Sequence, residues 1–145
     1  MTAGYSGTPL PQKLGIKPGC AVCVRGAPRD YAEIVAPLPD GVRIAAKVTD
    51  RTDLVHVFST TRAKLATELA SARKAMRDDA AIWVSWPKKA SGVRTDITED
   101  TIRELAFPLG LVDIKVCAVD DTWSGLKLML RKENRKESSG AAKRR

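Results

Sequence analysis

Residues 112–131, VDIKVCAVDDTWSGLKLMLR, decide the fold predicted for this chain. Val112–Val119 and Leu126–Arg131 both have the character of β-strands, and the six residues between them include Asp, Ser and Gly, which favour turns. Because a connection this short joins antiparallel neighbours, the two strands are expected to form a hairpin. The C-terminal end of the sheet is therefore predicted to be antiparallel.

Four earlier stretches also have strand character. The predicted strands are Cys20–Val24, Val42–Val48, Asp53–Phe58 and Ala80–Trp86. Asp53–Phe58 is almost continuously apolar, which is typical of a strand that is covered on both faces. We therefore expect layers on both sides of the sheet.

Helices are predicted in the connections between these strands. An amphipathic helix runs from Thr60 or Thr61 to Met76, and a second helix begins at the cap residue Thr98 and is closed by Gly110. A short helical turn is predicted at residues 9–15, and a further helix has Pro28 in its first turn, carries Tyr31, Ile34 and Val35 inward and ends at Pro37. This order predicts an α/β fold with three layers, namely a mostly parallel six-stranded sheet with a C-terminal antiparallel hairpin and helices on both faces.

The length of 145 residues and the net charge of +8 fit one domain with a basic tail. The domain is expected over residues 1–131, with residues 1–19 as an N-terminal arm and short helix. Arg131–Arg145 contains seven basic and two acidic residues, so residues 132–145 are predicted to be a basic disordered tail.

Three further features bear on the location of the protein. No apolar run approaches the roughly 20 residues that a membrane helix needs. The first residues have no signal-peptide character, and three cysteines are compatible with reduced thiols. We therefore expect a cytoplasmic protein with no membrane contact, whose oligomeric state the sequence leaves open.

The order of elements resembles that of S-adenosylmethionine-dependent methyltransferases. These proteins also end in a strand, a helix and a hairpin whose last strand is inserted antiparallel into the sheet. Leu14–Gly19 is similar to their approach to the first strand, and Asp53–Phe58 lies where their fourth strand would. The resemblance implies a shortened methyltransferase-like, or Rossmann-like, fold that lacks one strand-helix unit.

Three segments resemble a family of small bacterial proteins described as a domain of unknown function. They are Gly4–Leu10 (GYSGTPL), Trp83–Lys89 (WVSWPKK) and Asp121–Lys127 (DTWSGLK). The resemblance implies no activity. It marks two loops as distinctive, and loops on a rigid scaffold often carry function.

The loop after the first strand departs from the methyltransferase pattern. That superfamily uses an acidic residue and closely spaced glycines there, which let the backbone approach the cofactor. Here Arg25 replaces the acidic residue, Gly26 is the single glycine, and Pro28 removes an amide donor. S-adenosylmethionine is therefore disfavoured as a cofactor and none is predicted. Asp50 remains a candidate to bind the ribose of a cofactor, and Arg25, with the helix start, remains a candidate to bind a phosphate.

The loop that follows Ala80–Trp86 is the predicted binding site, because ligands bind where strands of open α/β sheets end. The proposed ligand-binding residues are Trp86, Lys88, Lys89, Ser91 and Arg94, with Arg25 added from the first loop. Two lysines, an arginine and the amides near Ser91 suit a phosphate or carboxylate. Trp83 and Trp86 are expected on one face of the strand, with Trp86 available for stacking.

No catalytic residue and no metal site is predicted. His56, the only histidine, lies in an apolar strand and is expected to be buried and neutral, with a general base as the alternative. Cys20 and Cys23 have the spacing of a redox pair, but residues three apart in a strand face opposite sides. They are expected to be structural thiols.

These observations favour a noncatalytic methyltransferase-like domain that binds an anionic small molecule or a protein partner at the rim near Trp86. An enzyme that uses S-adenosylmethionine or a nucleotide is the first alternative. The second is a nucleic-acid-binding module that uses residues 132–145. Glutamates interrupt this tail and no aromatic residue lies in it, which disfavours that role.

Overall fold

Strand β4 (Ala81–Pro87) runs through the middle of the sheet in the computed structural model, which describes residues 8–135. The other strands are β1 (Ala21–Arg25), β2 (Arg43–Ala45), β3 (Leu54–Phe58), β5 (Leu111–Ala118) and β6 (Trp123–Leu130). They are arranged in the order β2-β1-β3-β4-β6-β5. Every residue of β3 and β4 is buried, as the apolar character of these strands requires.

The pairing confirms the predicted topology. Strand β1 is parallel to β2 and β3, and β3 is parallel to β4. Strand β6 is antiparallel to both of its neighbours, β4 and β5. The last strand of the hairpin is thus inserted into the sheet.

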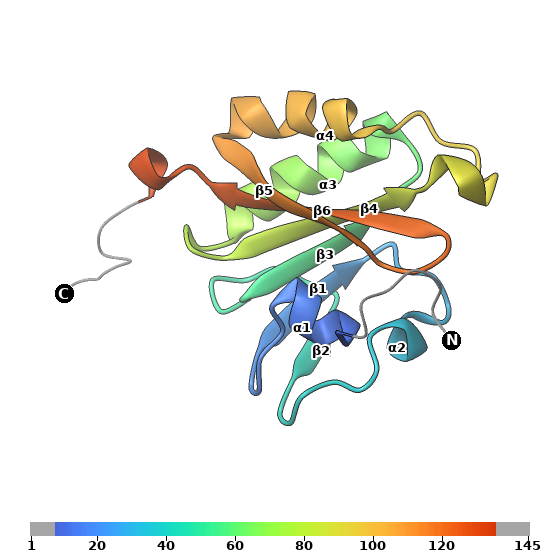
Figure 1. Ribbon diagram of the computed structural model, residues 1–145. Coiled ribbons are helices and arrows are strands. Elements are labelled where there is room, and N and C mark those ends of the chain that lie inside the picture. Colours follow the sequence, from blue (N-terminus) through green and yellow to red (C-terminus); the bar gives the residue numbers. More distant parts are fainter. Residues whose placement is uncertain (1–7, 136–145) are drawn as a thin grey trace.

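Helices cover both faces of the sheet (Figure 1). The α-helices are α1 (Leu10–Leu14), α2 (Tyr31–Ile34), α3 (Arg62–Ala75) and α4 (Glu99–Ala106), and the 3₁₀ turns are η1 (Lys89–Ser91), η2 (Phe107–Leu109) and η3 (Lys132–Asn134). Helices α3 and α4 lie on one face, and α1 and α2 on the other (Figure 1). No helix within residues 8–135 is long and apolar enough to cross a membrane.

Each face has its own hydrophobic core. Leu65 and Leu69 of α3 and Ile102 of α4 pack on Val84 and its neighbours in the sheet. On the other face, a second core joins α1, the α2 region and the same strands. The sheet is therefore the shared middle layer of the three.

Trp83 lies at the centre of the second core and is completely buried. Its indole N–H donates to the carbonyl of Leu14 at the end of α1 (2.9 Å). Gly125 of β6 lies against the ring, since a Cβ at this position would be only 3.2 Å from it. One side chain thus joins α1, β4 and β6.

The expectation that Trp83 and Trp86 share one face of β4 was wrong. Trp83 belongs to the core under α1, whereas Trp86 belongs to the core under α3 and α4. The two residues are three positions apart, and side chains alternate along a strand, so they must point to opposite faces.

Two elements are shorter than predicted. Strand β2 covers three residues instead of Val42–Val48, because the Ala46 carbonyl leaves the sheet and accepts a hydrogen bond from Arg25 (2.9 Å). Helix α2 is one turn, since Pro37 and Pro39 follow it and cannot continue a helix.

Residues 132–135 differ from the prediction that they belong to a disordered tail. Residues 132–134 form η3, and the Arg135 guanidinium donates to the Leu130 carbonyl (2.9 Å), so these four residues belong to the folded domain. Side-chain hydrogen bonding to the end of β6 explains the difference. Residues 136–145 lie outside the described residues.

We expect Trp83→Phe to lower the free energy of unfolding by about 1–3 kcal/mol, because it leaves the buried Leu14 carbonyl without its donor. Urea denaturation followed by circular dichroism measures this. Trp123→Phe is the matched control, since the half-buried Trp123 indole donates no hydrogen bond within residues 8–135. Equal losses in the two variants would contradict the role of the Trp83 hydrogen bond.

Candidate functional site

The loop between β4 and α4 is tied to neighbouring segments at both ends. The backbone N–H of Lys88 donates to the Thr122 carbonyl (2.8 Å), which joins the end of β4 to the β5–β6 turn. The Thr95 hydroxyl donates to the Thr60 carbonyl (2.7 Å), which joins the loop to the segment before α3. The path of the loop is therefore fixed by the sheet and by α3.

The serine of this loop serves the backbone. Ser91 Oγ donates to the Lys88 carbonyl (2.7 Å) and accepts from the N–H of Val93 (3.1 Å). Gly92 closes η1 with a left-handed backbone (φ 78°). The amides that were predicted to contact an anion are also engaged in the turn, since the N–H of Ser91 donates to the Lys88 carbonyl (3.0 Å) and the N–H of Gly92 to the Lys89 carbonyl (3.3 Å).

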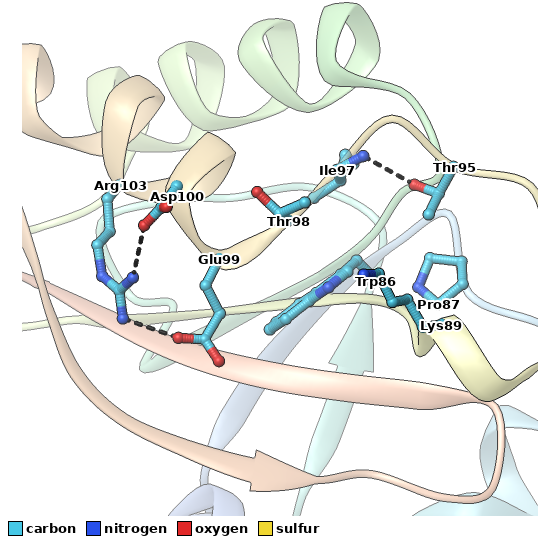
Figure 2. A pocket seen from close by; sticks show the side chains of 9 residues that line it. All are labelled: Trp86, Pro87, Lys89, Thr95, Ile97, Thr98, Glu99, Asp100 and Arg103. Atoms are coloured by element: carbon cyan, nitrogen blue, oxygen red, sulfur yellow. Dashed lines mark hydrogen bonds and ion pairs between the residues drawn. The ribbon is translucent and has the colours of Figure 1, made fainter.

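A cavity of about 500 Å³ lies between the end of β4 and the first turns of α4. It is lined by Trp86, Pro87, Lys89, Thr95, Ile97, Thr98, Glu99, Asp100 and Arg103. Figure 2 shows Trp86 on the sheet side of this cavity and Glu99, Asp100 and Arg103 along α4. Trp86 is only 7% exposed, so its ring forms a fixed apolar wall.

The guanidinium of Arg103 is surrounded by three carboxylates. It lies 2.8 Å from Glu99 and 3.0 Å from Asp100, both in the first turn of α4 (Figure 2). It also lies 3.1 Å from Asp113 of β5. Lys89, in contrast, is exposed and has no ion pair within residues 8–135. Lys89 is therefore the cation of this cavity that can attract an anion.

The start of α4 is capped by its own residues. The Thr98 hydroxyl accepts from the N–H of Thr101 (3.2 Å), and the Thr101 hydroxyl accepts from the N–H of Thr98 (3.1 Å). Glu99 and Asp100 add negative charge beside the positive end of the helix dipole. An anion in the cavity would therefore interact with Lys89 rather than with the helix start.

The structure brings together only part of the predicted site. Trp86 and Lys89 line the cavity, whereas Lys88, Ser91 and Arg94 do not. The sequence prediction omitted the second wall, which consists of Thr95, Thr98, Glu99, Asp100 and Arg103. The spacing of Glu99 and Arg103, four apart on a predicted helix, was the signal that could have indicated it.

Arg25 lies at a different place from the other predicted site residues. Its guanidinium makes two hydrogen bonds to the Glu68 carboxylate of α3 (2.9 and 3.2 Å) and a third to the Ala46 carbonyl. It lines a separate cavity of about 240 Å³ between β1, β2 and α3. Arg25 therefore lies apart from the β4 loop, and Glu68 holds its side chain against α3.

Gly26, the single glycine of the first loop, packs against protein. Its φ is +71°, and a Cβ here would lie 2.5 Å from the Phe58 carbonyl oxygen at the end of β3. Glycine is needed at this position for close approach of two backbone segments. The loop therefore lies directly on β3.

Asp50 lies in a turn closed by a hydrogen bond from the N–H of Thr52 to the Thr49 carbonyl (3.1 Å). Asp53, just beyond this turn, accepts from the N–H of Ala21 at the start of β1 (2.8 Å). The turn thus lies at the amino ends of the strands, whereas ligands of open α/β sheets bind at the carboxyl ends. Asp50 is misplaced for contact with a cofactor ribose there.

His56 is completely buried in β3. Its Nδ1 lies 3.0 Å from the Tyr31 hydroxyl and its Nε2 lies 2.7 Å from the Ser85 hydroxyl. Burial lowers the pKa of His56 to about 3, so the imidazole is neutral at physiological pH. The expected buried, neutral histidine is confirmed, and a general base would need contact with a substrate that this position does not allow.

The two cysteines of the first strand region face opposite sides, as predicted. Cys20 belongs to the core under α1 and α2, and Cys23 to the core under α3 and α4. Burial raises the pKa of both thiols. Their separation in different layers excludes a disulfide between them in this fold.

Residues 41–132, more than half of the chain, match the family model described as a protein of unknown function (DUF3052). The chain belongs to this family. The matched range includes the positions of Trp83–Lys89 and Asp121–Lys127, and residues 4–10 lie outside it. No curated protein matches the chain in sequence.

Solved structures similar to this DUF3052 chain include several methyltransferases. A putative type 11 methyltransferase from Sulfolobus solfataricus has a TM-score of 0.59 at 14% identity, over 92% of this chain and 93% of the other. A SAM-dependent methyltransferase from Aquifex aeolicus has a TM-score of 0.58 at 12% identity, over 83% and 87%. The B. subtilis M1A22 tRNA methyltransferase has a TM-score of 0.57 at 11% identity, over 89% and 70%. At these identities the similarity shows a methyltransferase-like, Rossmann-like fold.

We expect acid to destabilise the protein partly through His56. The unfolded chain binds this proton near pH 6.5, whereas the folded chain binds it only near pH 3. The free energy of unfolding should therefore fall by up to about 1.4 kcal/mol per pH unit below pH 6.5 from this group alone.

Urea denaturation of the wild type and of His56→Gln between pH 7 and 4 separates this contribution from that of the carboxylates. The glutamine variant should be less stable at pH 7, and the difference should shrink as the pH falls. A constant difference across the range would show that His56 is not responsible.

Proposed function

We propose that this chain is a noncatalytic methyltransferase-like domain that binds a small organic anion in the cavity between β4 and α4. The noncatalytic part rests on one observation, the structure of the loop after β1. There Arg25 is held by Glu68, and Gly26 lies against the end of β3.

The first loop uses its distinctive residues for internal contacts. In the methyltransferases that the sequence resembles, an acidic residue and closely spaced glycines serve the cofactor at this place. The positive Arg25 links β1 to α3 and to the end of β2, and the close approach that Gly26 permits is to the Phe58 carbonyl. In this arrangement neither Arg25 nor Gly26 is free to contact S-adenosylmethionine.

The β4–α4 cavity suits a small molecule better than a flat protein interface. Its volume of about 500 Å³ is within the range of roughly 300–1,000 Å³ that is usual for small-molecule sites. Trp86 and Ile97 provide apolar contact, and Lys89 provides a positive charge at the edge.

The carboxylates of the cavity restrict the charge of its ligand. Arg103 is neutralised by Glu99, Asp100 and Asp113, so it adds little net attraction. Glu99 and Asp100 would repel a group with several negative charges, such as a nucleotide triphosphate. A ligand with one carboxylate or sulfonate and an aromatic or apolar part fits this arrangement best.

Indole-3-acetate and tryptamine test this preference, because they share a ring and carry opposite charges. In ¹⁵N–¹H spectra, indole-3-acetate should shift the Trp86 indole N–H and the Lys89 and Thr95 amides in a saturable way, and tryptamine should not. Lys89→Ala should weaken binding about tenfold or more, as expected when a charged hydrogen-bond partner is removed.

Lys64→Ala is the matched control, since Lys64 is an exposed lysine on α3, outside the residues that line the cavity. It should leave binding unchanged, and both variants should keep their free energy of unfolding within about 0.5 kcal/mol. Equal shifts with the two compounds, or shifts confined to another face, would contradict the proposed anion site.

An enzyme that uses S-adenosylmethionine is the competing function, because similar solved structures include methyltransferases. Isothermal titration calorimetry with S-adenosylmethionine and S-adenosylhomocysteine distinguishes the two. We expect no binding heat for either compound at about 100 μM protein, a concentration that would reveal micromolar affinity. Tight binding of either compound would overturn the noncatalytic proposal.

A further inference from the structure

Part of the sheet is open on the side of α1 and α2. Along β6, the residues that face α3 and α4, such as Leu126 and Leu128, are buried, whereas Lys127 and Met129 on the other side are half-buried. The neighbouring residues of β5 on that side are also accessible, with Lys115 exposed and Cys117 half-buried. This part of the hairpin therefore presents side chains to solvent.

Two lysines lie directly opposite each other on this open face. Lys115 of β5 is the register partner of Lys127 of β6. Directly opposed side chains have Cβ atoms roughly 5 Å apart, and like charges at such positions destabilise a sheet. The pair therefore has an energetic cost for the fold.

A third lysine is brought to the same face by α1. Trp83 is the register partner of Lys127, and its indole holds the Leu14 carbonyl at the end of α1. Lys17 follows three residues after Leu14. Burial lowers the pKa of Lys127, and the charges of Lys115 and Lys17 lower it further, which agrees with this proximity. We call Lys17, Lys115 and Lys127 the lysine patch.

The lysine patch has no counter-charge within residues 8–135. None of its three residues forms an ion pair there. Asp113 of β5 is paired with Arg103 on the opposite face, and Asp53 is paired with Arg77.

The remaining segments carry more basic than acidic residues. Residues 1–7 contain no acidic residue, and residues 136–145 contain four basic residues and one acidic residue. The lysine patch is therefore available to an anionic partner.

We propose that the lysine patch binds the phosphodiester backbone of a nucleic acid. Lysine is a point charge with no preferred plane, so it suits phosphates without reading the sequence of bases. Protein interfaces are depleted in lysine and depend on aromatic or arginine anchors, and the patch contains neither. The net charge of +8 adds long-range attraction to a polyanion.

This surface differs from the β4–α4 cavity and from the basic tail. The patch lies on the α1 side of the sheet, whereas Trp86 and α4 are on the other side. Binding by the patch and ligand binding in the cavity can therefore be tested independently.

Fluorescence anisotropy with a labelled DNA duplex of about 20 base pairs, at about 50 to 200 mM NaCl, tests the proposal on the full chain. The wild type should bind with an affinity that falls steeply with salt. The triple variant Lys17→Gln, Lys115→Gln, Lys127→Gln should bind about tenfold or more weakly, and the salt slope should decrease by about 0.9 for each phosphate that the variant no longer neutralises.

Two triple variants with the same reduction in charge are the controls. Lys47→Gln, Lys64→Gln, Lys74→Gln removes exposed lysines of the β2–β3 connection and α3, and Lys143→Gln, Arg144→Gln, Arg145→Gln removes the end of the tail. Both should bind the duplex more tightly than the patch variant. If all three variants bound the duplex equally weakly, the loss of affinity would reflect net charge alone, and the proposal would be overturned.

Thermal unfolding shows whether the patch variant is folded. Its midpoint should be unchanged or raised, because the Lys115–Lys127 repulsion is relieved. If the triple variant does not fold, Lys115→Gln and Lys127→Gln alone should each reduce the salt slope, and unchanged slopes would overturn the proposal. Absence of duplex binding by the wild type, or tighter binding of poly-L-glutamate than of the duplex, would also overturn it.

Discussion

The hydrogen bond from the Trp83 indole to the Leu14 carbonyl is the interaction on which the arrangement of this protein depends. It joins α1 to β4 in the middle of the sheet, and the same ring requires the small Gly125 in β6. Three segments that are far apart in the sequence are thus placed by one buried side chain. The cavity on one face is lined by Trp86 at the end of β4, and the lysine patch on the other includes Lys127, the register partner of Trp83.

Much of the fold could be predicted because its signals are local. The apolar run Leu54–Phe58 marks a strand buried on both faces, the short turn after β5 requires a hairpin, and Thr98 marks the start of α4. Strand β2 could not be predicted to its full extent in the same way. Its early end depends on Arg25, which takes the Ala46 carbonyl out of the sheet from a position 21 residues away.

The candidate site was less predictable, because it depends on contacts between distant segments. The position of Lys89 after a central strand was sufficient to place it at the rim. No local pattern indicates that Glu68, 43 residues away, holds Arg25 against α3. The ion pair between Arg103 of α4 and Asp113 of β5 has no local signal either. The residues of the loop after β4 suggested an anion site, but the balance of charges in the cavity follows only from the three-dimensional arrangement.

The ends of the sheet have a consequence for the behaviour of the protein at high concentration. An exposed edge strand can pair with the edge of another molecule and begin aggregation. Here β2 is only three residues long, and the opposite edge, β5, has a register shift between Asp113 and Lys115. Neither edge presents a long regular row of backbone groups, and a charged lysine follows the irregularity. A very short edge at one end of the sheet and an irregular edge with a lysine at the other therefore disfavour strand-to-strand aggregation.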